Sequence, residues 1–359
     1  MGSDPGVPLP PFPREAGAAS GLPPHAPPLT DQPLDLSVIL STRNQAALLE
    51  ATLAHLALQQ VGALRWELIV IDNGSTDRTP EVLRASAARL PLVALQEPVR
   101  GKNRAMNRAL SVARGELLLF TDDDVVPDAH WIAQMQRAAT AWPEHIIFGG
   151  QILLAHPANA PAWIRHVVGF DIQLGRYSFL CPEGPIQALP VGPNYAVRAR
   201  ALRSRRFDES IGPGTGRHYA MGSETALLQR IVRETSSPPL YVPTAVVQHV
   251  VRPHQLTARY LCGRMFRAGR GTTRMRTRRA FRPLLGAPRH LWREAALAAG
   301  NVLLRVSADP GTRLRSGLRL AFLVGCIHEY RSEARGRAQA SPVATTATKR
   351  ATTLTSAGV

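Results

Sequence analysis

The sequence predicts an α/β fold: a Rossmann-like, mainly parallel sheet flanked by helices, followed by an arginine-rich helical C-terminal extension. Two observations predict the sheet. Strand-like and helix-like segments alternate from residue 36 onward, and polar or acidic residues follow the ends of four apolar runs. Such alternation is typical of parallel sheets wrapped by helices, in which the loops after the strands share one crevice.

The expected elements follow in chain order. The apolar runs predict strands over 36–40, 67–71, 92–95 and 116–120. Helical spacing of apolar residues predicts helices over 45–59, 79–89, 102–113 and about 128–140. After Gly149 the segments are shorter and interrupted by proline and glycine, which predicts a mixed sheet with long loops. We expect a helix over 222–233 and strands over 240–242 and 246–251 in this part.

The net charge of +17 is concentrated near the C-terminus. Residues 252–337 hold 19 arginines, no lysine and four acids, which gives +15. Segments 257–269 and 284–304 combine helical apolar spacing with arginines on the other faces. They predict either a helix pair resting on an anionic membrane surface or a packed helical region with solvated arginines. Nucleic-acid binding is disfavoured because no aromatic platform or zinc pattern accompanies the charge.

Composition divides the chain into four parts. Residues 1–34 are rich in proline, glycine and alanine and are expected to be disordered, as are residues 338–359. Between them we expect an α/β catalytic domain over 35–256 and a basic helical region over 257–337. Three widely spaced cysteines suggest neither disulfides nor a zinc site. With no signal pattern and no long apolar span, we expect a cytoplasmic protein, or one peripheral to the inner face of the cytoplasmic membrane.

The most informative feature is a run of three acids, Asp122, Asp123 and Asp124, directly after an apolar strand. Adjacent carboxylates repel one another, so a cation or hydrogen-bond donors must offset their charge. Oxygen ligands suit Mg²⁺ or Mn²⁺, which commonly keep phosphate oxygens as further ligands. An acidic surface turn before a helix is the alternative.

The other strand ends are also polar. Asp72 could accept a hydrogen bond from a base or ribose, although it could instead form a tight turn with Asp77. Residues 41–44 could bind a ligand or only cap a helix. Arg100, Gly101, Lys102 and Asn103 stand at a helix start, where backbone N–H groups and basic side chains could hold phosphate, or they could form a solvated basic loop. Together these strand ends suit a nucleoside diphosphate with a divalent cation.

In order and spacing, these motifs resemble the family 2 glycosyltransferases of the bacterial type, which have the GT-A fold. The matching segments are residues 38–44, 70–77, Gly101 with 105–107, and 120–124. Segments 192–198, 207–209 and 222–230 continue the resemblance, which covers roughly residues 35–270.

The resemblance implies a hexosyltransferase-like enzyme that inverts the anomeric carbon. It would move a sugar from a nucleotide-diphosphate sugar, with UDP-sugars expected first, to a hydroxyl of a glycan, lipid-linked or other acceptor. Cell-envelope or exopolysaccharide biosynthesis is the expected setting, and Mn²⁺ or Mg²⁺ the expected cofactor. Glu224 is implied as the general base, because Ser-Glu-Thr stands here in place of the family's usual Glu-Asp pair.

The resemblance also assigns the other site residues. Asp122, Asp124 and His249 would bind the metal, although His249 could equally be a core residue, and Arg252 would reach the diphosphate. Asn194 and Trp163 would line the acceptor side. Asp123 should point away from its neighbours if the chain stays extended. The residues expected to bind the nucleotide sugar are Thr42, Arg43, Asn44, Asp72, Asn73, Arg100, Gly101, Asn107, Asp122 and Asp123.

Two other functions remain open at this point. One is a non-catalytic, arginine-rich adaptor that binds membrane or nucleic acid on a degenerate nucleotide-sugar fold. The other, less favoured because no glycine-rich phosphate loop is visible, is a nucleotidyltransferase. The basic segment lacks the Gln-x-x-Arg-Trp signature of processive synthases, which favours addition of a single sugar.

Overall fold

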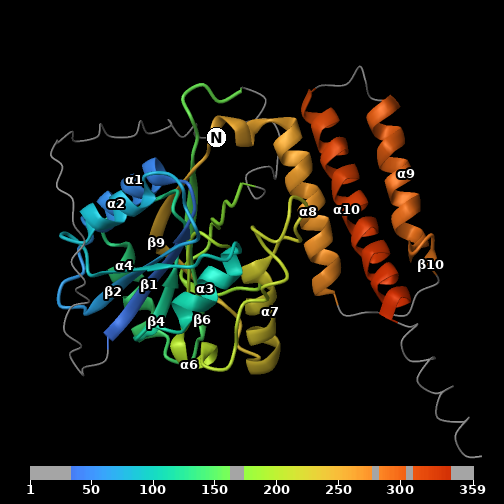
Figure 1. Ribbon diagram of the computed structural model, residues 1–359. Helices are drawn as coiled ribbons and strands as arrows, with labels where there is room; N and C mark the ends of the chain where they lie inside the picture. Colours follow the sequence, from blue (N-terminus) through green and yellow to red (C-terminus); the bar gives the residue numbers. More distant parts are fainter. Residues whose placement is uncertain (1–33, 162–173, 277–282, 305–309, 341–359) are drawn as a thin grey trace, which may run out of the picture. The chain divides into compact units, whose positions relative to one another are not determined.

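The computed structural model describes residues 34–161, 174–276, 283–304 and 310–340 (Figure 1). These residues form two compact units. The first, here called the sheet unit, contains the described residues up to Arg217 together with Gly222–Thr257. The second, the helical unit, contains His218–Met221 and the described residues from Ala258 onward. The division between Thr257 and Ala258 lies one residue from the boundary expected from composition.

The sheet unit is built on one mixed sheet (Figure 1). Within the described residues the strand order is β3-β2-β1-β4-β8-β6-β9-β5, with β7 paired to β9. β1, β2, β3 and β4 run parallel, and β8 turns the direction by pairing antiparallel with β4 and β6. The strands are β1 (Leu34–Thr42), β2 (Trp66–Asp72), β3 (Leu92–Gln96), β4 (Gly115–Phe120), β5 (Val125–Pro127), β6 (Ile147–Ala155), β7 (Gly184–Pro185), β8 (Tyr195–Arg198) and β9 (Leu240–Val250).

Helices cover both faces of this sheet, which explains why the middle of its central strands is apolar on both faces, as in residues 38–40 and 68–71. Val38 and Leu40 pack in one core with α1 and α4, whereas Ile39 packs in the other core with α3 and α7. The predicted α/β fold is therefore confirmed. The helices of this unit are α1 (Ala46–Leu56), α2 (Thr79–Ser86), α3 (Lys102–Leu110), α4 (Trp131–Ala141), α6 (Ala199–Leu202), α7 (Ser223–Thr235) and the short 3₁₀ helix η2 (Pro253–Leu256).

Two features of the second half differ from expectation. The two expected strands over 240–251 form the single strand β9, and an irregularity in its pairing with β6 takes up residues 243–245. The short strand β5 follows the aspartates and was not predicted. It pairs antiparallel with β9, so that Val125 lies opposite His249.

The helical unit consists of α8 (Ala258–Met275), the two-stranded hairpin β10 (Pro283–Leu284) and β11 (Ala287–Pro288), α9 (Arg289–Leu304) and α10 (Pro310–Ala340). The helix expected from residue 284 begins only at Arg289, because the preceding residues form the hairpin with Leu285 and Gly286 at positive φ. No helix in the described parts of the chain is long and apolar enough to cross a membrane.

Close approach of α8 and α10 depends on glycines. A Cβ atom on Gly269 would lie 2.0 Å from the Phe322 carbonyl oxygen, and one on Gly325 would lie 2.0 Å from the Phe266 carbonyl oxygen. Between these helices Glu329 is fully buried and accepts hydrogen bonds from Arg270 and Arg274, both at 2.7 Å. These two arginines therefore contribute to the packing of α8 against α10 and do not form a solvated face of the helix.

Candidate active site

The parallel strands bring the predicted polar residues to one edge of the sheet. Thr42 at the end of β1 lies in register with Asp72 at the end of β2, and β4 ends beside β1 at Phe120. The aspartates follow β4 directly. The common edge expected for the strand ends is thus present.

The aspartates do not continue as an extended chain, because a turn begins at Asp123. The expectation based on strand alternation is therefore wrong for Asp123. Its carboxylate accepts a 2.6 Å hydrogen bond from the Thr42 hydroxyl. Burial and the neighbouring charge of Asp124 raise the pKa of Asp123 to about 7. Thr42 and Asp123 thus support each other at the sheet edge.

Asp124 is buried and faces two basic side chains. One of its carboxylate oxygens is 3.4 Å from His249 Nε2, and the other accepts a 3.3 Å hydrogen bond from Arg252. His249 also contacts the Leu174 carbonyl oxygen through Nδ1 at 2.9 Å, which leaves Nε2 directed at Asp124. The pairing of β5 with β9 creates this arrangement.

Asp124, His249 and Arg252 stabilise one another in their charged forms. Burial opposes ionisation of Asp124, but the hydrogen bond and charge of His249, with Arg252, outweigh it and hold the pKa of Asp124 below its usual value. Burial likewise disfavours a charged imidazole, yet Asp124 outweighs this effect and raises the pKa of His249. The alternative of an apolar core histidine therefore does not apply.

Asp122 and Glu224 border a small depression in the sheet unit. Lys102 Nζ at the start of α3 lies 2.5 Å from one Asp122 oxygen. A Cβ atom on Gly192 would lie 3.4 Å from the other Asp122 oxygen and 3.9 Å from a Glu224 oxygen. The same depression is lined by Tyr195, whose pKa is raised well above its usual value, mainly by burial.

Lys102 belongs to the basic segment 100–103 that the sequence offered for phosphate, but its contact with Asp122 was not predicted. Burial opposes its charge, but Asp122 first, and then Glu224, raise its pKa above the ordinary value. The signal was present, because Lys102 follows Gly101 at a helix start on the correct edge of the sheet. Its partner Asp122 lies 20 residues further along the chain, and only the fold reveals the contact.

Glu224 occupies the first turn of α7, after Gly222, whose φ is +109°. The helix dipole favours a negative charge at this end. Glu224 is half-buried, with one oxygen directed towards Gly192.

The three predicted metal ligands do not form one cluster. Among the described residues, no group of three His, Cys, Asp or Glu side chains is arranged to hold a metal ion. Asp124 and His249 are adjacent, but Asp122 is paired with Lys102. The Asp124 carboxylate fits Mn²⁺ or Mg²⁺, since Mg²⁺ often takes only one or two carboxylates with phosphate oxygens and water, and the imidazole of His249 favours the transition metal Mn²⁺ of the two.

The loops expected at the nucleoside are held together by side chains. Asp72 accepts a hydrogen bond from the Ser75 backbone at 2.9 Å, which forms the tight turn offered as its alternative role. The Asn44 side chain accepts a hydrogen bond from the Thr76 backbone at 2.7 Å. Arg43 is half-buried and Arg100 is exposed. Asp77 caps both α1 and α2, as the alternative interpretation held.

Two predicted nucleotide-sugar residues act within the protein. The Asn73 amide donates to the carbonyl oxygens of Glu97 and Val99 and accepts from the Gly101 backbone N–H. The Asn107 amide donates to the Phe207 carbonyl oxygen and accepts from the Phe207 N–H. Both amides therefore hold neighbouring segments of the chain in place.

The acceptor-side expectation changes as well. Asn194 is fully buried: its oxygen accepts from Trp131 at 2.8 Å, and its nitrogen donates to the carbonyl oxygens of Gln151 and Ala245. It has no polar atom left for an acceptor and is a packing residue. Trp163 lies outside the described residues.

Comparison with known proteins supports the family assignment. Residues 37–174 match the family described as Glycosyl transferase family 2. A validoxylamine A glucosyltransferase of Streptomyces hygroscopicus subsp. jinggangensis is 33% identical over 32% of this chain and 28% of its own. A PGL/p-HBAD biosynthesis glycosyltransferase of Mycobacterium bovis is 33% identical over 33% of this chain and 46% of its own. These matches span less than half the length of either relative.

A solved structure shows the same fold. The mannosyltransferase PcManGT of Pyrobaculum calidifontis, solved with GDP-Man and Mn²⁺, superposes with a TM-score of 0.56 at 19% identity, covering 83% of this chain and 87% of its own. The predicted GT-A fold and the resemblance to family 2 are therefore confirmed. Residues 37–174 are thus similar to the glycosyltransferases of family 2, and the sheet unit has their fold.

Proposed function

We propose that this protein transfers a sugar from a nucleotide-diphosphate sugar to an acceptor hydroxyl, with inversion at the anomeric carbon. The observation that carries the proposal is the shared depression of Asp122 and Glu224. A carboxylate at the donor edge of the sheet and a second one on a helix start converge on the same glycine, Gly192. Two substrates can meet at such a point.

Glu224 is proposed as the general base. For inversion, the acceptor hydroxyl must attack from the side opposite the leaving diphosphate and lose its proton during the attack. A base must then lie within hydrogen-bond reach of that hydroxyl. Glu224 suits this role because it borders the depression from the side of α7, away from the aspartate turn.

Lys102 and Arg252 are proposed to stabilise the diphosphate. Each is held by one of the aspartates, Lys102 by Asp122 and Arg252 by Asp124, so both cations are fixed before the donor arrives. Fixed positive charge aimed at a developing negative charge is the main electrostatic contribution in such sites.

Asp124 and His249 are the residues that would hold the divalent cation. When bound, the cation supplies Lewis-acid stabilisation of the leaving diphosphate. Asp124 suits a cation because its pKa is held low and its carboxylate stays ionised.

The donor base is open between uridine and guanosine. UDP-sugars were expected from the resemblance, whereas the structural neighbour PcManGT was solved with GDP-Man. A donor panel should therefore contain both nucleotides. The curated relatives act on unlike acceptors by name, so the acceptor should be sought in a screen and not assumed.

The test is a transfer and hydrolysis assay over UDP- and GDP-sugars with Mn²⁺, performed on the whole protein. We expect Glu224→Gln to lower kcat by about 10²- to 10⁴-fold, the range for a general acid or base, while leaving nucleotide binding intact. Asp124→Asn should remove the metal dependence and weaken nucleotide binding in titration calorimetry.

Glu234→Gln is the matched control for Glu224→Gln. Glu234 lies at the other end of α7 and pairs with Arg205, away from the depression, so its loss should change transfer by less than about twofold. Wild-type turnover in Glu224→Gln would remove this residue from the base role. Absence of any nucleotide binding would instead favour a non-catalytic adaptor.

A further inference from the structure

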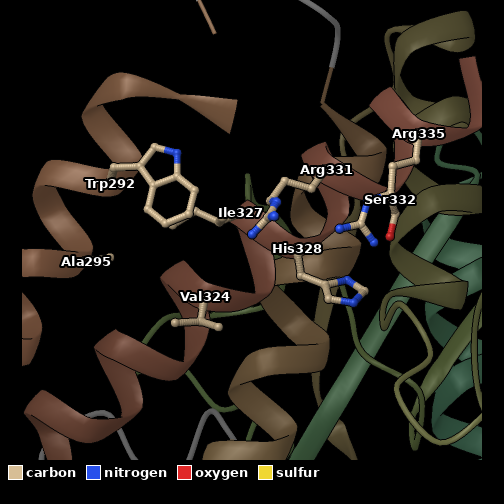
Figure 2. Close-up of a pocket in the computed structure, with 8 residues that line it drawn as sticks. All are labelled: Trp292, Ala295, Val324, Ile327, His328, Arg331, Ser332 and Arg335. Carbon is tan, nitrogen blue, oxygen red and sulfur yellow. The ribbon is translucent and has the colours of Figure 1, made fainter. Parts of the chain in front are cut away.

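The helical unit contains a cavity of about 320 Å³ between α9 and α10. Figure 2 shows Trp292 extending from α9 on one side and Arg331 and Arg335 from α10 on the other. Val324 and Ile327 add apolar surface to the lining. The cavity thus has an apolar wall and a cationic wall. Packing of a hydrophobic core would not need the arginines, and a solvated charged surface would not need the apolar wall.

The apolar wall continues into the β10–β11 hairpin. The Trp292 indole N–H donates a 2.8 Å hydrogen bond to the Leu284 carbonyl oxygen, which ties the hairpin to the cavity. Leu284 is 43% exposed and Leu285 is 71% exposed. Leu285 has a φ of +49°, an uncommon conformation for a leucine. The hairpin therefore presents two adjacent leucines beside a half-buried tryptophan.

Within the described residues, the cationic wall has no carboxylate partner. No carboxylate of the described residues lies within ion-pair distance of Arg331 or Arg335. Three other arginines of this unit do have carboxylate partners: Arg270 and Arg274 pair with Glu329, and Arg319 pairs with Glu294. Arg331 and Arg335 are four residues apart on one helix, where like charges are mutually destabilising. A bound anion would offset this repulsion.

We propose that this cavity binds the headgroup of an anionic phospholipid at a membrane surface. The phosphate would lie between Arg331 and Arg335, and the start of an acyl chain would lie against Trp292 and Val324. The leucines of the hairpin would enter the interfacial layer. Apolar residues, an interfacial tryptophan and arginines on one surface are the features of a peripheral membrane contact. The inference is independent of the proposed glycosyl transfer.

The apolar wall decides between the possible anions. A free phosphate ion would use only the two arginines and would leave the cavity beside Trp292 wet. A nucleic acid would likewise leave Leu284 and Leu285 in water. A phospholipid covers both walls, which favours it over either alternative.

Vesicle flotation of the whole protein tests the proposal. We expect binding to equimolar phosphatidylcholine–phosphatidylglycerol vesicles and little binding to phosphatidylcholine alone. The double variant Arg331→Ala/Arg335→Ala should lower the partition coefficient by about 25-fold, since each basic residue near an anionic surface contributes roughly fivefold. Glycerol phosphate at matched ionic strength should compete poorly, because it lacks the apolar part.

Arg313→Ala/Arg315→Ala is the matched control on the same helix, with the same loss of charge. Arg331 lies 16 residues beyond Arg315, roughly 24 Å along α10, so the control should change binding by less than about twofold. Equal losses in both double variants would overturn the proposal, because general attraction would then explain the binding. The proposal would also be overturned if the protein bound a random DNA oligonucleotide or glycerol phosphate in preference to vesicles.

Occupancy of the cavity has its own readout. Phosphatidylglycerol with brominated acyl chains should quench tryptophan fluorescence in the native protein, and Trp292→Phe should abolish most of that quenching. Arg331→Ala/Arg335→Ala should keep the native thermal midpoint, since both side chains are exposed. Unchanged quenching in Trp292→Phe would place the lipid elsewhere and contradict the assignment.

Discussion

At the scale of single residues, the three aspartates have separate partners. Asp122 contacts Lys102, Asp123 accepts from Thr42, and Asp124 faces His249. The repulsion within the run is therefore relieved by three different groups. This explains how the run is tolerated in the described structure without a cluster of three metal ligands.

The Lys102 ion pair gives a prediction at this scale. Lys102→Met should raise the KM for the nucleotide sugar by about 10- to 100-fold, because a hydrogen bond to a charged group contributes about 1.5–3 kcal/mol. Steady-state kinetics over a range of donor concentrations measures it, with Lys102→Arg expected to recover part of the loss.

Arg108→Met is the control, because Arg108 is exposed on the same helix. It should leave the KM within about twofold of the native value, as is usual for a surface change. An unchanged KM in Lys102→Met would mean that Lys102 only neutralises Asp122 and does not act on the donor.

Strand-end residues could be predicted from the sequence, but the hydrogen-bond partners of the asparagines could not. The apolar runs before Asp72 and Asp122 fix where these acids lie in a parallel sheet. The partner of Asn107, by contrast, is Phe207, 100 residues away. Asn194 contacts Trp131, 63 residues away, and Ala245, 51 residues away. Whether an amide faces a ligand or the chain depends on these distant contacts.

At the scale of elements, local pattern predicted the first half of the chain well. The strands β1, β2, β3 and β4 lie within one or two residues of the predicted spans, because each contains an apolar run, which is buried in β1, β2 and β4. β5 was missed because three residues make too short a pattern, and its pairing with β9 is a long-range event. That pairing is nevertheless what brings His249 to Asp124.

The α8–α10 contact gives the element-scale prediction. Gly325→Ala should destabilise the helical unit by about 1–3 kcal/mol, since the added methyl group forces the closely packed helices apart. Thermal unfolding followed by circular dichroism is the measurement.

Gly317→Ala supplies the control within α10. A Cβ atom there would have its nearest neighbour at 3.9 Å, an ordinary contact. Alanine should stabilise this helical position by roughly 0.5–1 kcal/mol. If the two variants behaved alike, close packing at Gly325 would not be the constraint.

At the scale of the whole molecule, the chain contains separate hydrophobic cores. The sheet unit has a core on each face of its sheet, and the helical unit has its own core around Leu323 and Ile327. The excess charge follows this division, because most of it belongs to the segment beyond residue 252. In composition, the same part of the chain is marked by 19 arginines against four acids over residues 252–337.

Separate cores predict separate unfolding transitions in differential scanning calorimetry. Saturating UDP or GDP with Mn²⁺ should raise only the transition of the sheet unit. Ligand at about 100 times its Kd adds about 2.7 kcal/mol, which corresponds to roughly 5–10 °C for a unit of this size. A single transition that moves as a whole would show that the two units unfold cooperatively.

The three hydrogen bonds of Asn73 have a consequence for the thermodynamics of donor binding. They join the turn after β2 to the segment that leads into α3, so these two loops of the donor edge are ordered before any ligand is present. A binding site that is already rigid loses little conformational entropy when it is filled. A small contact area with the donor can then still give sufficient affinity, because these loops are already ordered when the protein folds.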